Sequence, residues 1–266
     1  MSDKYGSIED DFLEEALRIE QAGSENGIPL RIIGCLAFRI QCPDYVDLHM
    51  AMGREVTDID YVSYYKYQRD AIDLFRDELG YKWVSAGFAR ASTLRDLFID
   101  KERKRKVDVF YDHLDFCHKI DFKDDDRLSV DKPTIPLAEL FLEKTQIVQI
   151  NAKDLKDLVV LFLAHDVSED FDDSMINGRL IAERLSGDWG FYYTVTQNIE
   201  KFKRFVATVE EIDKNQAELV ISRAEKLRKL IEDKPKSIGW KLRAKIGTKK
   251  RWYKHVHAMD GERKAD

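Results

Sequence analysis

Asp58 and Asp60, two aspartates separated by one residue, are the part of this 266-residue chain best suited to chemistry. With Thr57 and Ile59 they lie in a β-branched run that predicts a strand from Val56 to Tyr64. Because side chains alternate along a strand, both carboxylates should project from one face while Ile59 enters the core. Two ionised carboxylates this close repel each other unless a cation lies between them, and hard oxygen ligands suit Mg²⁺.

A third aspartate, Asp108, has the same kind of setting. It lies between Val107 and Val109 in a run that predicts a strand from Lys106 to Tyr111. If this strand pairs beside the first, three carboxylates converge at one sheet edge. Such a set can hold two metal ions about 3.5–4 Å apart, one activating an attacking oxygen and one neutralising a leaving phosphate.

A glycine turn, Gly34-Cys35, precedes these aspartates. It follows a predicted first strand, Ile28–Ile33, and begins a predicted short helix that runs to about Ile40. Backbone N–H groups at such a junction can cradle a phosphate. Each part has an ordinary alternative, a solvated strand end or a plain turn, but the combination is more specific than either part.

The elements that must position these residues follow from periodicity. A helix is expected over Tyr67–Leu79, closed by Gly80, then a strand over Tyr81–Ser85 and a hairpin of Leu94–Asp100 with Lys106–Tyr111. The polar run Asp121–Asp131, ending in Lys132-Pro133, is the best boundary. Beyond it, helices are expected near Leu137–Ile150, Lys153–Ala164, Asp173–Leu185, Thr196–Phe205 and Asp213–Ile231.

This order predicts an α+β fold, with a mixed-sheet core followed by an α-helical C-terminal domain. We expect a catalytic core at 1–132, a helical domain that completes the site at 133–233, and a basic C-terminal tail at 234–266. The segment Cys42–Glu55 is expected to be a loop or an inserted turn of helix.

Asp157 enters a run, Leu158–Ala164, that is apolar around the whole helix and should therefore be buried. A carboxylate there needs a partner, which Lys144 or a nucleotide-facing network would supply, so a structural and a functional role both stay open. Asp154, three residues after Asn151, is expected to complete the helix N-terminal cap.

The glycine turn, the D-x-D strand and the later aspartate resemble the nucleotidyltransferase superfamily that includes DNA polymerase β. Within it the chain most resembles the AbiEii/AbiGii-type nucleotidyltransferases, found as toxins and as stand-alone proteins. The stretches that carry the resemblance are Arg54–Asp60 (like R-x-T-x-D-I-D, with Thr57 one place later than usual), Lys106–Asp108 (like K-x-D), Ala138–Gln146 (a helix whose lysine, here Lys144, contacts phosphates) and Lys153–Leu158 (like R/K-D-x-x-D-L).

The match keeps the family's order from about Pro29 to Leu163, with two departures. Cys35 stands where the family has Gly or Ser, and a thiol is a poorer donor than a hydroxyl. The long separation of Gly34 from Asp58 implies an insertion between Cys42 and Arg54.

The resemblance implies transfer of a nucleoside monophosphate from an NTP to an acceptor hydroxyl, with release of pyrophosphate, at a two-metal Mg²⁺ site that Mn²⁺ can also fill. Asp58, Asp60 and Asp108 would be the catalytic and metal-binding residues. The nucleotide-binding residues would be Gly34, Cys35, Arg54, Thr57, Lys106, Lys144 and Asp157. The acceptor would be tRNA or another RNA, or a protein, and an antitoxin protein would be a further partner.

Two other functions remain open from the residues. A nucleotide-binding or partner-docking module that has lost turnover is favoured by Cys35 and opposed by the intact aspartates. A small-molecule nucleotidyltransferase of the antibiotic-modifying type would need an acidic acceptor pocket.

Other catalytic motifs do not compete with this site. The six histidines are scattered without the spacing of a metal site or a catalytic triad. The chain also lacks the G-x-x-x-x-G-K-[ST] loop with which P-loop kinases bind phosphate.

The composition, 44% apolar and 35% charged, is that of a folded globular protein. No apolar run approaches the roughly 20 residues of a membrane span, the start of the chain is polar, and three sparse cysteines fit a reduced cytoplasm.

The net charge of −6 hides a basic tail, since Lys234–His257 has nine Lys and Arg and no Asp or Glu. Trp240, Trp252 and Tyr253 interleave with these cations. The pattern suits contact with RNA or an anionic membrane, and its plainest interpretation is a solvated or partner-packed terminal segment.

Overall fold

A mixed five-stranded sheet forms one half of the molecule in this computed structural model, which describes residues 8–84, 94–170 and 172–255. The strand order is β1-β2-β5-β4-β3, in which β2 and β5 are parallel and the other neighbours are antiparallel. The strands are β1 (Arg31–Ile33), β2 (Ile59–Ser63), β3 (Lys82–Val84), β4 (Arg95–Ile99) and β5 (Lys106–Tyr111). The three predicted strands and the predicted hairpin are therefore confirmed, although Ser85 lies outside the described residues.

One face of the sheet is covered by two helices, α1 (Ile8–Glu25) and α4 (Gln68–Asp73), and α4 continues as a π-helical turn, η3 (Leu74–Glu78). Tyr61 on β2 donates its hydroxyl hydrogen to the carbonyl oxygen of Ala16 over 2.7 Å. On β4, the ring of Phe98 stacks on Phe75 with 4.1 Å between centroids. Because side chains alternate along a strand, Asp60 on β2 and its partner Asp108 on β5 project from the opposite face of the sheet.

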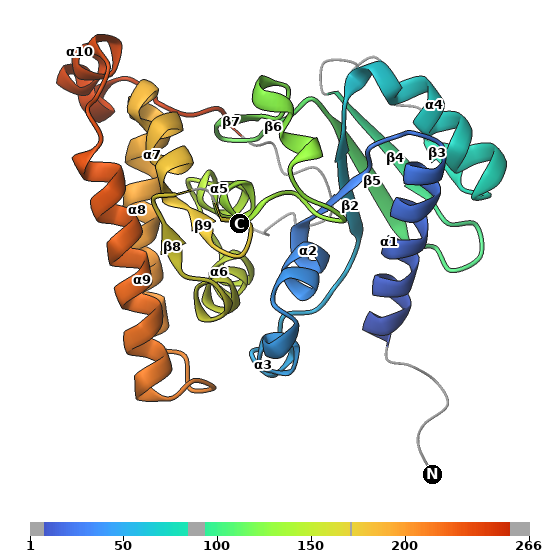
Figure 1. Ribbon diagram of the computed structural model, residues 1–266, viewed down its shortest axis with the longest axis horizontal. Helices are drawn as coiled ribbons and strands as arrows, with labels where there is room; N and C mark the ends of the chain where they lie inside the picture. Colours follow the sequence, from blue (N-terminus) through green and yellow to red (C-terminus); the bar gives the residue numbers. More distant parts are fainter. Residues whose placement is uncertain (1–7, 85–93, 171, 256–266) are drawn as a thin grey trace, which may run out of the picture.

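The segment that follows β1 turns directly into α2 (Gly34–Gln41), as predicted. The predicted insertion folds as a 3₁₀ turn, η1 (Pro43–Tyr45), and a short helix, α3 (Val46–Ala51). Both pack near the helical half of the molecule rather than near the outer strands (Figure 1).

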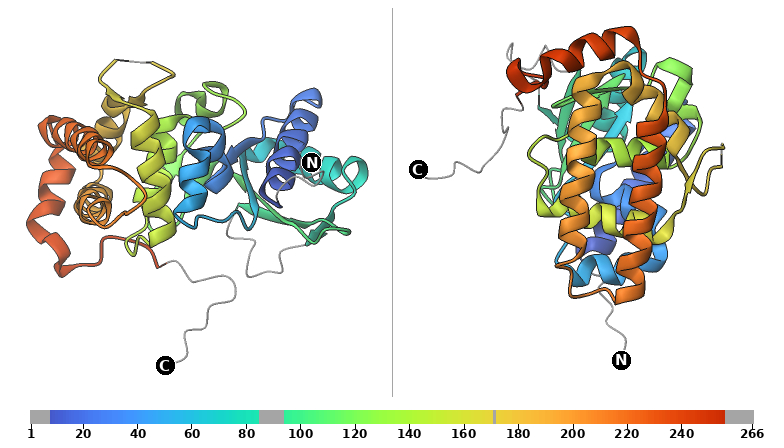
Figure 2. Two further views of the ribbon diagram at one scale, coloured as in Figure 1. Left: turned by 90° about the horizontal axis from the view of Figure 1, so that it is seen from below. Right: turned by 90° about the vertical axis from the view of Figure 1, so that its left-hand side faces the viewer.

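The other half of the molecule is helical. It contains α5 (Leu137–Thr145), α6 (Ala152–Ala164), α7 (Gly178–Gly187), α8 (Trp189–Val206), α9 (Lys214–Asp233) and α10 (Ile238–Ile246). Figure 2 shows α7, α8 and α9 at the end away from the sheet, with α5 and α6 between them and α2. An α+β sheet region followed by helices is thus the observed architecture, as predicted.

Several boundaries differ from the predictions because tertiary contacts set them. The helix expected from Asp173 begins only at Gly178, because Ile176–Asn177 forms strand β9 beside β8 (Val167–Ser168). The helix expected from Thr196 begins at Trp189, where Asp188 caps it. The strand pair β6 (His113–Asp115) with β7 (Lys119–Asp121) and the helix α10 were not predicted.

A single hydrophobic core runs through both halves, from Ala16 on α1 to Ile231 on α9. Helix α5 is its centre, because all nine of its residues are buried. It contacts α2 on one side and α6, α7 and α8 on the other. Within the described residues, none of the helices combines the length and apolarity needed to cross a membrane.

Candidate active site

The parallel pairing of β2 with β5 brings two of the predicted catalytic aspartates together. Asp60 and Asp108 are direct partners in the register, so their side chains project from the same face of neighbouring strands. Asp58 comes immediately before β2 and is half-buried, as is Asp60, whereas Asp108 is 4% exposed. The predicted pairing is confirmed, and it lies on the face of two interior strands rather than at a sheet edge.

Like charges dominate this face. Burial, then the charges of Asp58, Asp108 and Glu143, hold the pKa of Asp60 well above its ordinary value, and Lys144 opposes them only in part. A bound divalent cation would relieve this repulsion, and oxygen-only ligands match the preference of Mg²⁺. The residues present therefore fit a magnesium ion.

The three carboxylates are not gathered into one tight ligand set. Asp58, Asp60 and Asp108 do not have ligand atoms that all lie within 4.8 Å of one another. Among the described residues, Cys35, His49 and Asp157 meet that distance. Asp108 is held instead by Arg95 on β4, whose Nε lies 2.7 Å from its Oδ1. Arg95 thus neutralises one carboxylate of the face.

Gly34 lies against Asp60 at the end of β1. Its φ of +71° is in the left-handed region, and a Cβ built on it would lie 3.0 Å from Oδ2 of Asp60. A side chain here would therefore be strained by the backbone and would press on the carboxylate. The N–H of Gly34 donates to Oε2 of Glu143 over 3.3 Å, so in this structure the turn holds a carboxylate oxygen.

Asp157 on α6 is fully buried and has three partners. Arg54 donates from Nε over 2.8 Å, His49 contributes Nε2 at 2.9 Å, and Nζ of Lys144 lies 3.2 Å away. Burial alone would raise the pKa of Asp157, but Lys144, His49 and Arg54 outweigh it and keep the pKa below its ordinary value. The partner expected for this carboxylate is therefore present, as is the predicted cap of Asn151 with Asp154.

Cys35 borders this cluster, and its thiol with His49 and Asp157 satisfies the distances of a metal site. Burial raises the pKa of the Cys35 thiol to about 11, so the thiol stays protonated near neutral pH. The oxygens of Asp157 already bind Arg54 and Lys144, and these two cations would repel a further one. We therefore interpret the cluster as an ion-pair centre.

Lys144 connects the ion-pair centre to the carboxylate face. Its Nζ lies 2.9 Å from Oε1 of Glu143 and 3.2 Å from Oδ2 of Asp157, although the residue is only 7% exposed. Burial lowers the pKa of Lys144, but the charges of Glu143, Asp157 and Asp154 raise it overall, so the ammonium group stays charged. A fixed positive charge beside Asp60 is suited to neutralising a phosphate.

The remaining predicted residues are spread around the face. Thr57 and Lys106 are exposed, and the Thr57 hydroxyl donates to Oδ1 of Asp58 over 3.1 Å. Lys106 begins β5 two residues before Asp108, so it shares the face of that aspartate. Arg54 is bound to Asp157, and among the described residues it forms no hydrogen bond or ion pair with the sheet aspartates.

Sequence reasoning missed three residues of this region: Glu143, Arg95 and His49. Glu143 directly precedes Lys144 on α5, and this adjacency is the signal that could have identified it. The role of Arg95 depends on the β4–β5 register, in which Leu97 faces Asp108 and Arg95 faces Phe110. His49 lies in the insertion, where the sequence carries no signal for it.

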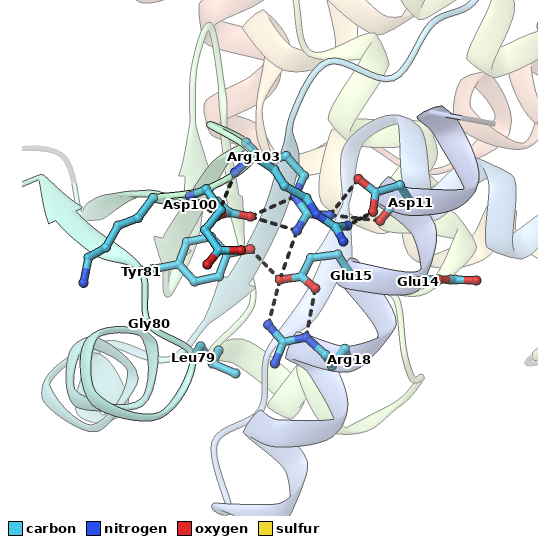
Figure 3. Close-up of a pocket in the computed structure, with 12 residues that line it drawn as sticks. Asp11, Glu14, Glu15, Arg18, Leu79, Gly80, Tyr81, Asp100 and Arg103 are labelled. Carbon is cyan, nitrogen blue, oxygen red and sulfur yellow. Dashed lines mark hydrogen bonds and ion pairs between the residues drawn. The ribbon is translucent and has the colours of Figure 1, made fainter. Parts of the chain in front are cut away.

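A separate cavity of about 530 Å³ lies between α1, the turn before β3 and the turn between β4 and β5. Figure 3 shows Asp11, Glu15, Arg18, Asp100 and Arg103 turned toward one another, whereas Glu14 points away from them. Glu15 accepts hydrogen bonds from Tyr81 and Arg18, and Arg105 binds Asp100. Because these charges are paired internally, we assign the cavity a structural role in joining α1 to the β4–β5 turn.

No protein-family model and no curated protein matches this chain. Among solved structures, the crystal structure of a "putative nucleotidyltransferase from H. pylori" aligns with 85% of this chain and 98% of that chain, at 13% sequence identity and a TM-score of 0.41.

Proposed function

We propose that the chain is a magnesium-dependent nucleotidyltransferase that transfers a nucleoside monophosphate from an NTP to an acceptor hydroxyl and releases pyrophosphate. The observation that carries the proposal is the adjacency of Asp60 and Asp108 on parallel interior strands, with Asp58 two residues before Asp60. Two carboxylates on one face of the sheet and a third directly before β2, beside a glycine turn and a buried lysine, suit phosphoryl-group chemistry, which depends on positioning and electrostatics.

Each residue has a role in this proposal. Asp58 and Asp60 would bind both Mg²⁺ ions, for which Mn²⁺ can substitute. Asp108 would bind the ion that activates the acceptor hydroxyl and would help to deprotonate that hydroxyl. The bound ions would neutralise phosphate charge and lower the pKa of the attacking hydroxyl. Lys144 keeps its positive charge while buried, so it can offset the charge of the triphosphate. The backbone N–H groups of the Gly34 turn would contact phosphate oxygens once Glu143 releases them.

The test is transfer of label from each α-labelled NTP to tRNA, to total protein and to small hydroxyl compounds. Asp60→Asn should lower transfer by a factor on the order of 10³ or more, because the metal site loses a charged ligand. Asp73→Asn, an exposed position on α4 with a 48% exposed side chain, is the matched control and should keep full activity. Retained turnover in Asp60→Asn would overturn the proposal.

A second candidate function is nucleotide binding without turnover. It is favoured by the contact between the Gly34 N–H and Glu143, which occupies the donor that a triphosphate would use, and by Cys35 in place of a hydroxyl or glycine. Magnesium-dependent NTP binding in calorimetry, with no pyrophosphate released across the whole acceptor panel, would favour this candidate over transfer.

The acceptor and the relation to AbiEii-type toxins are proposals of the same kind. An RNA acceptor predicts transfer of label to tRNA in the panel above. A small-molecule acceptor of the antibiotic type predicts label on the hydroxyl compounds alone. A toxin predicts that growth of an expressing cell slows, and that Asp60→Asn restores growth without an antitoxin.

A further inference from the structure

Helix α10 is attached to the body of the protein through one side only. Trp240 packs edge-on against Tyr192 of α8, with 5.1 Å between ring centroids. The guanidinium carbon of Arg243 lies 4.6 Å from the ring centroid of Trp189. These two contacts fix the orientation of the helix, and Figure 1 shows α10 at an outer corner of the molecule, beyond α9.

The side of α10 turned away from these contacts is apolar. Ile238, Leu242 and Ile246 are spaced four residues apart, so they form one stripe along the helix. Their exposed fractions are 79%, 59% and 45%, and the first two are the highest among the exposed large hydrophobic residues of the described chain. Three aliphatic side chains exposed along one helix face indicate a surface that binds a partner when the protein functions.

Positive charge borders the apolar stripe. Lys241 and Lys245 each precede a stripe residue by one position, so they lie beside it on the helix surface, and both are exposed. Lys249, Lys250 and Arg251 follow directly and are also exposed. None of these five cations forms an ion pair with a described carboxylate. The covering partner should therefore be negatively charged as well as apolar.

The aromatic residues of the tail are used for packing. Trp240 is engaged on Tyr192, and Trp252 packs against Tyr193 and donates from Nε1 to the hydroxyl of Thr194 over 3.0 Å. A Cβ on Gly190 would lie 2.5 Å from the carbonyl oxygen of Trp252, so this part of the tail lies tightly on α8. Stacking on RNA bases needs free aromatic rings, whereas the exposed groups of α10 are aliphatic and cationic.

We infer that α10 binds an anionic lipid surface, with Ile238, Leu242 and Ile246 entering the acyl boundary and Lys241 and Lys245 contacting lipid phosphates. An aliphatic stripe with flanking cations on a protruding helix matches the chemistry of interfacial helices. The cations from Lys249 to Arg251 add attraction to a negative leaflet. The basic segment is described as far as His255, and Val256 and His257 lie outside the described residues.

Vesicle co-sedimentation tests the inference with the full chain. Phosphatidylcholine vesicles that contain about one third phosphatidylglycerol should bind the protein, and pure phosphatidylcholine vesicles should bind it weakly, because the cations need an anionic surface. Replacing Ile238, Leu242 and Ile246 by Ser should weaken binding by about tenfold or more. The double variant Lys241→Gln/Lys245→Gln should weaken binding and flatten its dependence on salt.

Leu219→Ser is the matched control, because Leu219 is an equally apolar residue, 41% exposed, on α9. It should bind vesicles as the unmodified chain does, and circular dichroism should show all variants folded. Failure to bind the anionic vesicles would overturn the inference, as would triple-Ser binding equal to that of the unmodified chain. Binding of single-stranded RNA in place of vesicles, or a dimer that only the triple-Ser variant loses, would identify a different partner and equally overturn it.

Discussion

At the scale of single residues, Gly34 is the position where conformation and chemistry are most closely joined. Its positive φ excludes an unstrained side chain, and its Cα lies so close to Asp60 that a methyl group would contact the carboxylate at 3.0 Å. Gly80 has a similar φ of +75°, but nothing lies within 4 Å of the place where its Cβ would be. The two glycines therefore separate backbone strain from the effect on the carboxylate.

Alanine substitutions at these two positions should differ in activity more than in stability. Gly34→Ala and Gly80→Ala should each lose about 1–2 kcal/mol of unfolding free energy, because each places a Cβ in the left-handed region. Only Gly34→Ala should also weaken Mg²⁺-dependent NTP binding, since only its Cβ displaces Asp60. Urea unfolding and calorimetric titration measure the two effects. Equal nucleotide binding in the two variants would contradict the role assigned to Gly34.

The strands that carry Asp60 and Asp108 could be predicted because strand alternation is a local property. That the two aspartates share a face depended on the pairing of the two strands, which was assumed from the sequence and which the structure shows. Glu143 and Arg95 could not be assigned to the site, because their contacts depend on how a distant helix and a hairpin pack against those strands. Only the folded structure shows these contacts. Glu143 accepts a hydrogen bond from the Gly34 N–H over 3.3 Å, and Arg95 donates one to Asp108 over 2.7 Å.

At the scale of elements, the buried carboxylate of Asp157 joins α6 to the segment around α3. Arg54 and His49 come from that segment, and Lys144 comes from α5, so three parts of the chain meet on one side chain. Removing one partner from a buried ion pair leaves the others desolvated and unpaired, which costs more than the pair itself contributes.

Asp157→Ala should therefore lower the unfolding free energy by about 3–5 kcal/mol. The reason is that Arg54 would remain buried without its counter-charge, and Lys144 would lose one of its partners and keep Glu143. Urea unfolding followed by circular dichroism measures the change. Glu183→Ala removes a surface partner, 43% exposed, of Lys234 and should cost less than about 1 kcal/mol. Similar losses in the two variants would show that the cluster is not an ion-pair centre.

Elements with strong periodicity were predictable, and those that depend on partners were not. The hairpin of β4 with β5 and the helix α9, capped by Asp213, follow from local patterns. The two-residue strands β8 and β9 exist only because the chain brings them together in parallel. Helix α10 lies in a run whose many cations predict a charged tail, and its helical signal is only three aliphatic residues four positions apart.

At the scale of the whole molecule, His118 ties the β6–β7 region to α8. It is 6% exposed, its Nε2 lies 2.8 Å from the Thr194 hydroxyl, and its ring stacks on Phe191 with 4.9 Å between centroids. Thr194 also accepts the hydrogen bond from Trp252, so strand pair, helix and tail meet here. Burial lowers the pKa of His118 to about 4, and the charge of Asp188 opposes this only weakly.

The stability of the protein should accordingly depend on pH through His118. The unfolded chain, with an ordinary His pKa of 6.5, binds a proton more readily than the folded chain, so stability is complete above about pH 6.5 and falls toward pH 4. Between pH 7 and pH 5 this residue should account for a loss of about 2 kcal/mol. His118→Phe keeps the ring stacking and should lose that part of the pH dependence in urea unfolding. An unchanged difference between the two pH values would contradict the assignment.

The complete burial of α5 also bears on how such a chain can change over generations. Each of its nine side chains is buried, and the helix contacts both the sheet-side helix α2 and the helices of the other half. A substitution on α5 therefore has to be tolerated by neighbours from both halves at once. Recombination that exchanged one half between diverged copies would mismatch this shared helix, so the two halves should be inherited as one unit.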